Sequence, residues 1–371
     1  MIPVVGEMAS IGAGDLVWNA TVALALIGEG QMQTANGNVG ASGEILAAAG
    51  LTPLTVGPRD GLALCNNASH SAALSALGLA GAWRAYEAAQ TCAALTLESF
   101  RANLSPLDAR VLALRPQPGQ VEAADGLLAR LKGSGLHADG AARRLQDPLS
   151  LRNIVQVHGA VQAALTFLEL AVHAEINGAS DNPTALVDDE VILSAGAYHT
   201  PHLTNAVETV SRAFAHLCVT QLARLSKMMA ARFTDLPTFL AAPGSDSNGF
   251  APVMKTAEAV VSEILHTAQP VAIWPSINAD GVEDAMTGTP TAARALLRVA
   301  DYACYLSAIE FLVSAQAIDL RVCRDELGAP MIDVYSWVRS HSAELKSDRP
   351  LSGDIEALAD QIRTGAVPAT A

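Results

Sequence analysis

Aromatic residues are scarce in this sequence, since Phe, Trp and Tyr together make up 4% of its 371 residues. Half of the chain is nevertheless apolar, and alanine is abundant. Alanine is the strongest helix former, so this mixture favours helices that pack closely through small side chains over a sandwich of short strands. The chain is long enough to bury a sizeable core, as one large domain or two ordinary ones.

An excess of basic residues is also missing. The 23 lysines and arginines are outnumbered by 37 acidic residues, which gives a formal net charge of −14. Nucleic acids and anionic membranes attract basic patches, so we expect neither as a partner. The global charge does not fix the substrate, because the local charge of a site can oppose it.

The cysteines lack the spacing of a disulfide framework or of a thiolate metal site. They are odd in number and widely separated: Cys65, Cys92, Cys218, Cys304 and Cys323. No His, Asp and Glu spacing indicates a metal site either. We therefore expect reduced thiols and no metal.

A signal peptide and a membrane span are not predicted. The N-terminus lacks a basic start, and Glu7 and Asp15 interrupt its apolar residues. No uncharged apolar run is long enough to cross a bilayer. Together with the reduced thiols, this predicts a soluble cytoplasmic protein.

The pattern of glycine, proline and apolar residues predicts a mainly α fold, a long-helix bundle with irregular loops at the helix ends. Residues 1–67 are rich in glycine and are expected to form an entry region of loops around one helix. Residues 68–323 are expected to form the central bundle, and residues 324–371 a more charged helical tail. Apolar residues at helical spacing predict helices at Leu16–Gly28, 68–100, Asn153–Asn177, His202–Thr234, Phe250–Gln269 and Thr289–Val322.

Individual helix positions also lead to expectations. Val207, Val210, Phe214 and Leu217 repeat at steps of three and four residues, which predicts a buried stripe. His158 and His173 lie within an apolar helix, where we expect histidines that pack and have hydrogen-bond partners.

Six spaced blocks occur in one order along the chain. They are DGLALCNN (Asp60–Asn67), QDPLSLRN (Gln146–Asn153), NGASDNP (Asn177–Pro183), AYH (Ala197–His199), GVED (Gly281–Asp284) and AQAIDLR (Ala315–Arg321). With LIGEG at Leu26–Gly30, they resemble the histidine and phenylalanine ammonia-lyase family. The resemblance implies a long-helix bundle of the fumarase and aspartase type, a homotetramer, and lyase chemistry on a small amino or related carboxylic acid.

The family's electrophile is MIO (methylidene-imidazolone), made from an internal Ala-Ser-Gly of its own backbone. The glycine nitrogen attacks the alanine carbonyl, and the serine then loses its hydroxyl. Here Ala13-Gly14 stands where that triplet belongs, one residue short at the serine. The sequence as written cannot form the group, so we expect no cofactor unless the serine is restored or hidden by a modification.

A complete Ala-Ser-Gly occurs later, at Ala41-Ser42-Gly43. The family has Asp-Leu after its triplet, and this order is met by Asp15 rather than by Glu44. We expect the Ser42 hydroxyl to cap a helix that starts near Gly43, with Glu44 favourable in its first turn. A relocated chromophore is the alternative.

The resemblance implies a catalytic set of Ala13, Gly14, Tyr198 and Glu283, and a substrate-binding set of Asn66, Arg152 and His199. Arg152 matches an arginine that holds the substrate carboxylate, for which a planar guanidinium is suited; the alternative is a surface arginine. Asn66 either borders the substrate or ties down a loop. Glu283 matches a carboxylate that faces the substrate, although a Glu-Asp pair at a turn is often solvated. Tyr198 replaces a phenylalanine and adds a hydroxyl that can donate to a substrate.

Further departures from the family bear on the chemistry. Leu149 replaces a tyrosine that takes part in proton transfer, and leucine can neither donate nor accept a proton. Thr200-Pro201 follows His199 in place of Gly-Gln. The family's N-terminal segment, with the loop that carries the general base, has no counterpart before Met1. Ordinary MIO turnover by this chain alone is therefore not expected.

Two classes of function remain open. The first is a carbon–nitrogen lyase or isomerase with a different acid–base pair, such as Tyr198 and Glu283, acting alone or completed by a separate N-terminal chain of a split lyase. The second is a catalytically inactive binding or scaffold subunit of the same fold. Retained polar residues favour the lyase, whereas the missing serine and Leu149 favour the scaffold. A truncated gene is a third possibility. We favour the lyase.

Overall fold

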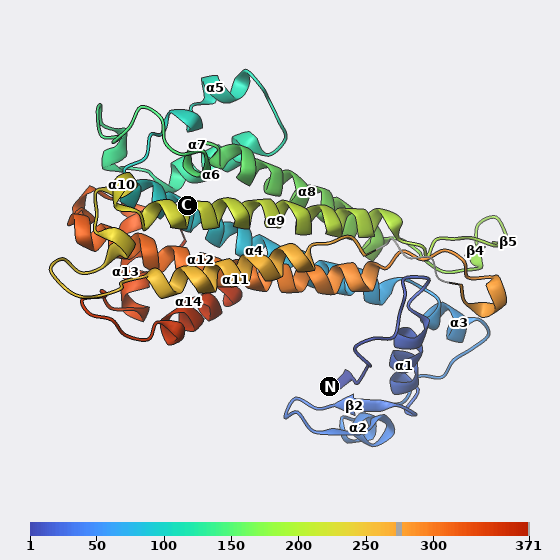
Figure 1. The fold of residues 1–371 in the computed structure, drawn as a ribbon. Coiled ribbons are helices and arrows are strands. Elements are labelled where there is room, and N and C mark those ends of the chain that lie inside the picture. Colours follow the sequence, from blue (N-terminus) through green and yellow to red (C-terminus); the bar gives the residue numbers. More distant parts are fainter. Residues whose placement is uncertain (272–276, 370–371) are drawn as a thin grey trace. The chain divides into compact units, whose positions relative to one another are not determined.

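The computed structural model describes residues 1–271 and 277–369, and it is mainly helical. Its helices are α1 (Leu16–Leu26), α2 (Ser42–Ala48), α3 (Asp60–Cys65), α4 (Ser69–Phe100), α5 (Ala109–Ala113), α6 (Gln120–Arg130), α7 (Leu149–Arg152), α8 (Ile154–Asn177), α9 (Pro201–Met228), α10 (Ala231–Thr234), α11 (Ala251–Thr267), α12 (Thr289–Arg321), α13 (Ala329–His341) and α14 (Ser352–Thr364) (Figure 1). Its strands are β1 (Ile2–Pro3), β2 (Gln31–Gln33), β3 (Val39–Ala41), β4 (Thr184–Leu186) and β5 (Val191–Leu193).

The chain forms two compact units, each built from separate parts of the sequence. Unit 1 comprises residues 1–78, 168–208 and 270–294, and unit 2 comprises residues 79–167, 209–269 and 295–371. The long helices α4, α8, α9 and α12 contribute residues to both units. The proposed division of the sequence at residues 67 and 323 stays a prediction.

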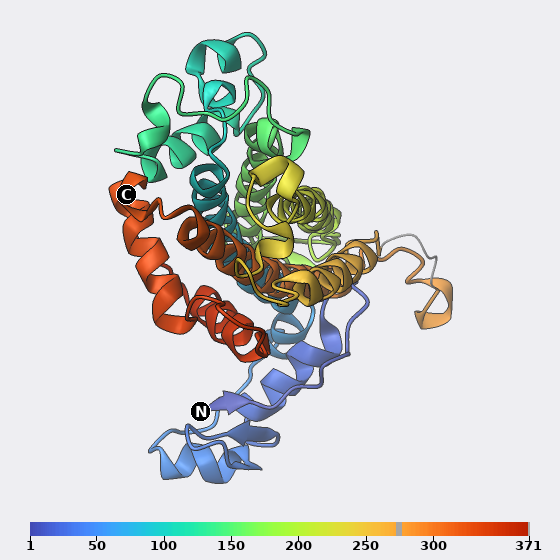
Figure 2. The ribbon, with the colours of Figure 1, turned by 60° about the vertical axis from the view of Figure 1, so that its left-hand side comes forward.

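The predicted mainly α bundle is confirmed. Within unit 2, α4, α8, α9 and α12 run side by side in both ribbon views (Figures 1 and 2). The predicted helix at 202–234 is divided, because α9 ends at Met228 and α10 begins at Ala231. The stripe predicted on α9 is fully buried: Val207, Val210, Phe214 and Leu217. Burial of each such large side chain contributes about 1.5–3 kcal/mol, so this stripe is a main source of the stability of α9.

Small residues let the helices approach closely, as the alanine-rich composition predicts. The alanines of α4 that are 0–1% exposed are Ala82, Ala85, Ala88, Ala89, Ala93 and Ala94. At the start of α6 the chain approaches α8, where a Cβ on Gly159 would lie 2.8 Å from Gln120 Cα. A Cβ on Gly119, which also has a φ of +79°, would lie 2.9 Å from Ala163 N. Only glycine avoids both clashes, so these two residues set the spacing of the two helices.

A buried polar cluster joins three of the long helices within unit 2. Arg224 on α9 and Glu310 on α12 form a completely buried ion pair, with Nε to Oε1 at 2.9 Å and Nη2 to Oε2 at 3.1 Å. The Thr96 hydroxyl on α4 donates to the same Glu310 Oε1 at 2.7 Å. Because the partners of the α12 carboxylate come from both α4 and α9, the cluster fixes how these helices align.

The two helix histidines differ from expectation. His158 is buried in α8, but neither of its ring nitrogens has a hydrogen-bond partner among the described residues. Burial, and next the positive charge of Arg224, lower the pKa of His158 well below its ordinary value. His173 is exposed, so the packing role predicted for it is wrong. Helix α8 is long and apolar enough to cross a membrane by length and composition alone, and half of its most apolar window is buried.

A small antiparallel sheet of order β1-β2-β3 forms the N-terminal part of unit 1, with Met32 opposite Gly40. The expected capping role of Ser42 is wrong. Helix α2 begins at Ser42 itself, without a side-chain cap. The Ser42 hydroxyl instead accepts a hydrogen bond from Gly30 N at 3.0 Å, which ties α2 to the turn after α1. Ser42 is completely buried there.

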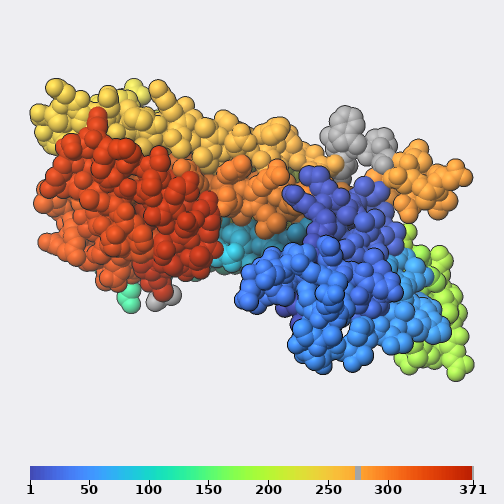
Figure 3. Space-filling model, turned by 90° about the horizontal axis from the view of Figure 1, so that it is seen from below, coloured from blue at the N-terminus to red at the C-terminus, as the bar shows by residue number. Residues whose placement is uncertain are grey.

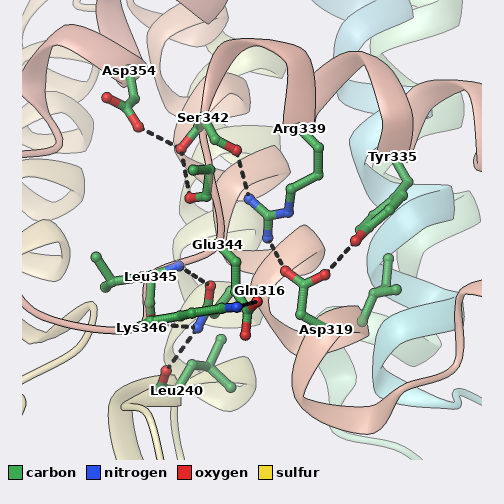
Figure 4. A network of polar contacts seen from close by, with 12 residues as sticks. Leu240, Gln316, Asp319, Tyr335, Arg339, Ser342, Glu344, Leu345, Lys346 and Asp354 are labelled. Atoms are coloured by element: carbon green, nitrogen blue, oxygen red, sulfur yellow. Dashed lines mark hydrogen bonds and ion pairs between the residues drawn. The ribbon is translucent and has the colours of Figure 1, made fainter.

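The C-terminal tail packs as α13 and α14, which appear in red as one continuous mass in Figure 3. A polar network joins these helices to α12 (Figure 4). Asp319 accepts hydrogen bonds from the Tyr335 hydroxyl and from Arg339. Gln316 pairs with the Leu345 backbone, accepting at 2.9 Å and donating at 3.1 Å. These bonds satisfy buried polar groups at the end of unit 2.

Candidate active site

The loop from Ser10 to Asp15 is held tightly within unit 1. Thr287 Oγ1 donates to Gly12 O at 2.9 Å, and Gly288 N donates to Ile11 O at 3.1 Å. Ala13 forms an antiparallel bridge with His199. The loop is therefore bound both to the segment before α12 and to the segment before α9.

Asp15 anchors the end of this loop. Its side chain is 1% exposed and accepts hydrogen bonds from Ser71 N at 2.6 Å, from Ser71 Oγ at 2.9 Å and from Ser10 Oγ at 2.7 Å. Ser71 lies in the first turn of α4, where a helix presents unpaired N–H groups and a negative charge is favourable. Asp15 therefore has a structural role in shaping the loop.

Buried threonines fix the starts of α9 and α12. Thr289 Oγ1 lies 2.7 Å from Thr200 Oγ1, 2.6 Å from Thr204 Oγ1 and 2.7 Å from Thr287 Oγ1. All four side chains are at most 3% exposed. Because Thr287 in turn donates to Gly12 O, the hydroxyl chain links both helix starts to the loop.

A cavity of about 590 Å³ opens beside this loop, within unit 1. Its lining residues are Ala13, Leu16, Leu62, Asn66, Asn182, Gly196, Tyr198, His199, Val282, Glu283, Asp284 and Ala285. Of the predicted residues, it brings together Ala13, Asn66, Tyr198, His199 and Glu283. Its volume is in the range of small-molecule sites.

Gly14 follows the lining residue Ala13, and a side chain there would crowd Asn66. Its φ is +67°, and a Cβ there would lie 2.8 Å from Asn66 Oδ1 and 3.6 Å from Tyr198 Cδ2. Gly12 has a φ of +84°, and a Cβ there would overlap Thr287 Oγ1 and lie 2.9 Å from Gly288 N. Both positions therefore require glycine.

Asn66 follows α3 and ties down a loop, whereas contact with a substrate stays a prediction. Its Nδ2 donates to Asn182 O at 2.9 Å, which ties two loops together, while the residue also lines the cavity. Asn182 Oδ1 accepts from Ala195 N at 2.8 Å. Arg59 holds the same loop through Asp181 Oδ2 and Pro183 O, both at 2.6 Å. The side of the cavity formed by Asn66 and Asn182 is thus held by side-chain amides and one ion pair.

Tyr198 and His199 precede α9 and are both half-buried. The Tyr198 ring lies against Gly14, and its hydroxyl makes no hydrogen bond with a described residue. His199 N donates to Gly196 O at 3.0 Å, which closes the turn before the helix. Both residues line the cavity.

Glu283 and Asp284 form the acidic side of the cavity. Glu283 is half-buried in a tight turn, in which Asn278 N donates to Glu283 O at 2.9 Å. Neither carboxylate forms an ion pair or hydrogen bond with the described part of the chain. The described lining residues include no lysine or arginine.

His70, beside the Asp15 anchor, has a displaced pKa. Its ring stacks on Trp18 with centroids 3.8 Å apart. Burial lowers the pKa of His70, an effect that the nearby Asp15 charge opposes and the Arg294 charge adds to. A neutral imidazole therefore packs on the indole near neutral pH.

Arg152 and Leu149 belong to unit 2. Arg152 ends α7 and is half-buried, and its Nη1 donates to Gln146 Oε1 at 2.8 Å. Leu149 begins the same helix and is 58% exposed. The carboxylate-binding role of Arg152 stays a prediction.

Sequence reasoning did not single out Asp284 or Asn182 as cavity residues, nor the threonine chain. Asp284 lies beside Glu283 in GVED, and Asn182 lies in NGASDNP, so these two sequence blocks carried a usable signal. Thr287 and Thr289 gave no signal of their own, because a buried hydroxyl chain depends on segments far apart in the sequence.

Comparison with known proteins places this chain among lyases. A profile of aromatic amino acid lyases matches residues 1–340. Histidine ammonia-lyase of Anaeromyxobacter dehalogenans is 35% identical over 99% of this chain and 74% of that protein. Histidine ammonia-lyase of Paracidovorax citrulli is 33% identical over 100% of this chain and 72% of that protein.

Solved structures agree in fold. The ergothioneine-degrading enzyme ergothionase of Treponema denticola matches with a TM-score of 0.93 and 29% identity, over 98% of this chain and 73% of that one. Tyrosine aminomutase of Streptomyces globisporus matches with a TM-score of 0.91 and 29% identity, over 99% of this chain and 73% of that one. This chain therefore spans about three quarters of the relatives it matches.

Proposed function

Because the chain belongs to the aromatic amino acid lyase family, we propose that it is a carbon–nitrogen lyase or isomerase that acts without MIO. The observation that carries this proposal is the cavity that joins the Ala13 loop to Asn66, Tyr198, His199 and Glu283. The substrate proposed is a small amino or related carboxylic acid. Ammonia-lyases, an aminomutase and an ergothioneine-degrading enzyme are among the relatives, which supports the reaction class rather than one side chain.

The residues of the loop do not fit MIO. Ala13-Gly14 carries no hydroxyl to expel, because the triplet is one residue short at the serine. Ser10 is the nearest serine, and its hydroxyl donates to Asp15. The proposed mechanism therefore has no step through this group.

The chain's own residues supply the proton transfers in this proposal. Glu283 is a free carboxylate at the cavity wall and acts as the base that removes the β-proton. Tyr198 lines the same cavity, and in this proposal its hydroxyl donates a hydrogen bond to the substrate. Arg152 is proposed to bind the carboxylate through its planar guanidinium.

A panel of amino acids tests this function on the purified protein. We expect amine release, together with absorbance of an α,β-unsaturated acid, from at least one of histidine, tyrosine, phenylalanine and their N-methylated derivatives. Glu283→Gln should lower the rate by about 10²–10⁴-fold, as removal of a general base does. Asp189→Asn, an exposed acidic residue outside the cavity, is the matched control.

A non-catalytic binding subunit is the second candidate function. The hydrogen bond from Asn66 to Asn182 favours it, because it gives Asn66 a structural role that needs no chemistry. The exposed Leu149 favours it as well, because its side chain cannot transfer a proton. Tight binding of a carboxylic acid that is lost on Arg152→Ala, without turnover of any substrate, is the result that would support this function over the lyase.

We also propose a cytoplasmic homotetramer, as the family resemblance implies, either alone or with a separate N-terminal chain. Large apolar side chains of α8 support association, since Leu170 is 67% and Ile176 is 60% exposed. Light scattering on the purified protein should give four times the mass of the chain. A monomer at micromolar concentration would contradict the tetramer.

A further inference from the structure

We infer that unit 2 has a small-molecule site of its own, which binds an aromatic carboxylic acid that carries no amine. The site is a cavity of about 530 Å³, lined by residues of α4, α6 and α14 and by residues 365–369. Its volume is in the range of small-molecule sites. All of its lining residues belong to unit 2, whereas the candidate active site lies in unit 1. The inference therefore does not depend on the proposed lyase reaction.

The chain after α14 builds one wall of this cavity. Gly365 follows the helix in the left-handed conformation, with a φ of +77°. A glycine in this conformation is a common way to end a helix and redirect the chain. Val367 and Pro368 after the turn line the cavity. A Cβ on Gly365 would lie 3.6 Å from Arg84 Cδ, so the stem of Arg84 lies against this turn.

Most of the lining is apolar, which suits the body of an aromatic ligand. The apolar lining residues include Trp83, Ala88, Ala129, Ile362, Val367 and Pro368. Trp83 is half-buried, and its ring meets the Tyr86 ring edge to face with centroids 5.9 Å apart. Aromatic rings favour such edge-to-face and offset-stacked contacts, so the indole is a suitable partner for the ring of a ligand.

The two arginines of the lining differ in their partners. Arg130 is buried, and its Nε donates to Thr91 Oγ1 at 3.0 Å and its Nη1 to Gly126 O at 2.9 Å. Its Nη2 pairs with Glu87. Arg84 is exposed and forms no hydrogen bond or ion pair within the described part of the chain. Its planar guanidinium can therefore take both oxygens of a carboxylate.

The charge of the lining selects an acid over an amino acid. Arg84 and Arg130 face a single acidic lining residue, Glu87, so the lining is positive in a chain whose net charge is −14. Because Glu87 already pairs with Arg130, an ammonium group on the ligand would lose water without gaining a partner. A ligand with an aromatic ring and a carboxylate alone matches both the apolar wall and Arg84.

Three ligands of the same carbon skeleton test the inference on the purified full chain. They are 3-phenylpropionate, 3-phenylpropan-1-ol and phenylalanine. The readout is the part of the tryptophan fluorescence change that Trp83→Phe removes, so it reports this cavity rather than the active site. We expect the acid to bind about tenfold more tightly than either the alcohol or phenylalanine. Absence of a Trp83-dependent change at millimolar acid overturns the inference, as does tighter binding of phenylalanine.

Variants of the free arginine test what holds the carboxylate. Arg84→Gln should weaken binding of the acid about tenfold and abolish its advantage over the alcohol. Arg84→Lys keeps the positive charge and should retain part of that advantage. Arg115→Gln, at an exposed position outside the cavity, is the matched control and should change neither affinity.

Both substitutions at Arg84 should leave the fold intact, because the side chain is exposed and unpaired within the described residues. Circular dichroism checks this for each variant. An acid-over-alcohol preference that is the same in the wild type and in Arg84→Gln contradicts the assignment. That result leaves the proposed lyase function intact, since the amine-release assay of the active site is separate from this measurement.

Discussion

Asn66 occupies the space that a side chain on Gly14 would need, since its Oδ1 would lie 2.8 Å from a Cβ at that glycine. The same asparagine donates to Asn182 O at 2.9 Å, so it is held in place from the other side. This contact and the positive φ of Gly14 both restrict that position to glycine. The cavity remains, with Tyr198 and Glu283 in it.

The hydroxyl chain before α12 should stabilise the loop. Thr287→Val removes the donor to Gly12 O and leaves a buried carbonyl unpaired. We expect a loss of about 1–3 kcal/mol in the free energy of unfolding, measured by urea denaturation. Thr291→Val, at an exposed position of the same segment, is the control. Equal losses in both variants would show that the bond to Gly12 does not matter.

The buried ion pair of unit 2 should be costly to break on one side only. Arg224→Met leaves the Glu310 charge buried without its partner, and we expect a loss of about 3–5 kcal/mol in unfolding free energy. The double variant Arg224→Met with Glu310→Leu removes both charges and should recover at least half of that loss. A double variant that is less stable than either single one contradicts this account.

Glu98 should make stability depend on pH. Burial raises its pKa from 4.5 to about 7, although hydrogen bonds from the Ser134 side chain and from Gly328 N oppose the change. The folded state therefore holds this proton more tightly than the unfolded state. The resulting stabilisation is present below pH 4.5 and is lost as the pH rises to about 7. The difference corresponds to roughly 3 kcal/mol.

Chemical denaturation between pH 5 and 8 measures this effect. Glu98→Gln should flatten the decline in unfolding free energy, because its amide does not titrate. Glu122→Gln, an exposed residue in the first turn of α6, should keep the wild-type dependence. Parallel pH profiles for the wild type and Glu98→Gln are the result that would rule out Glu98 as the cause.

The sequence predicted the long helices because apolar periodicity and the absence of proline are local signals. Residues 68–100 were expected as one helix, and α4 spans Ser69–Phe100. The break after Met228 was not predicted, because residues 229–234 contain no glycine or proline. The role of Ser42 was also missed, since its acceptor contact with Gly30 comes from an earlier turn rather than from its own helix.

The site was predictable in part, because only some of its residues lie in local sequence motifs. Asn66, Tyr198, His199 and Glu283 lie in blocks that match a known family, and the fold brings them to one cavity. The restriction at Gly14 could not be read from the sequence, because it depends on Asn66, which lies about fifty residues away. The threonine chain depends likewise on contacts between the starts of two helices.

The central claim is that the loop around Ala13-Gly14 remains an ordinary peptide while the cavity keeps its polar residues. Intact mass spectrometry with near-ultraviolet absorbance of the purified protein tests it most directly. We predict the mass of the unmodified chain and no imidazolone band. A mass lower by two water molecules, together with such a band, would contradict the claim.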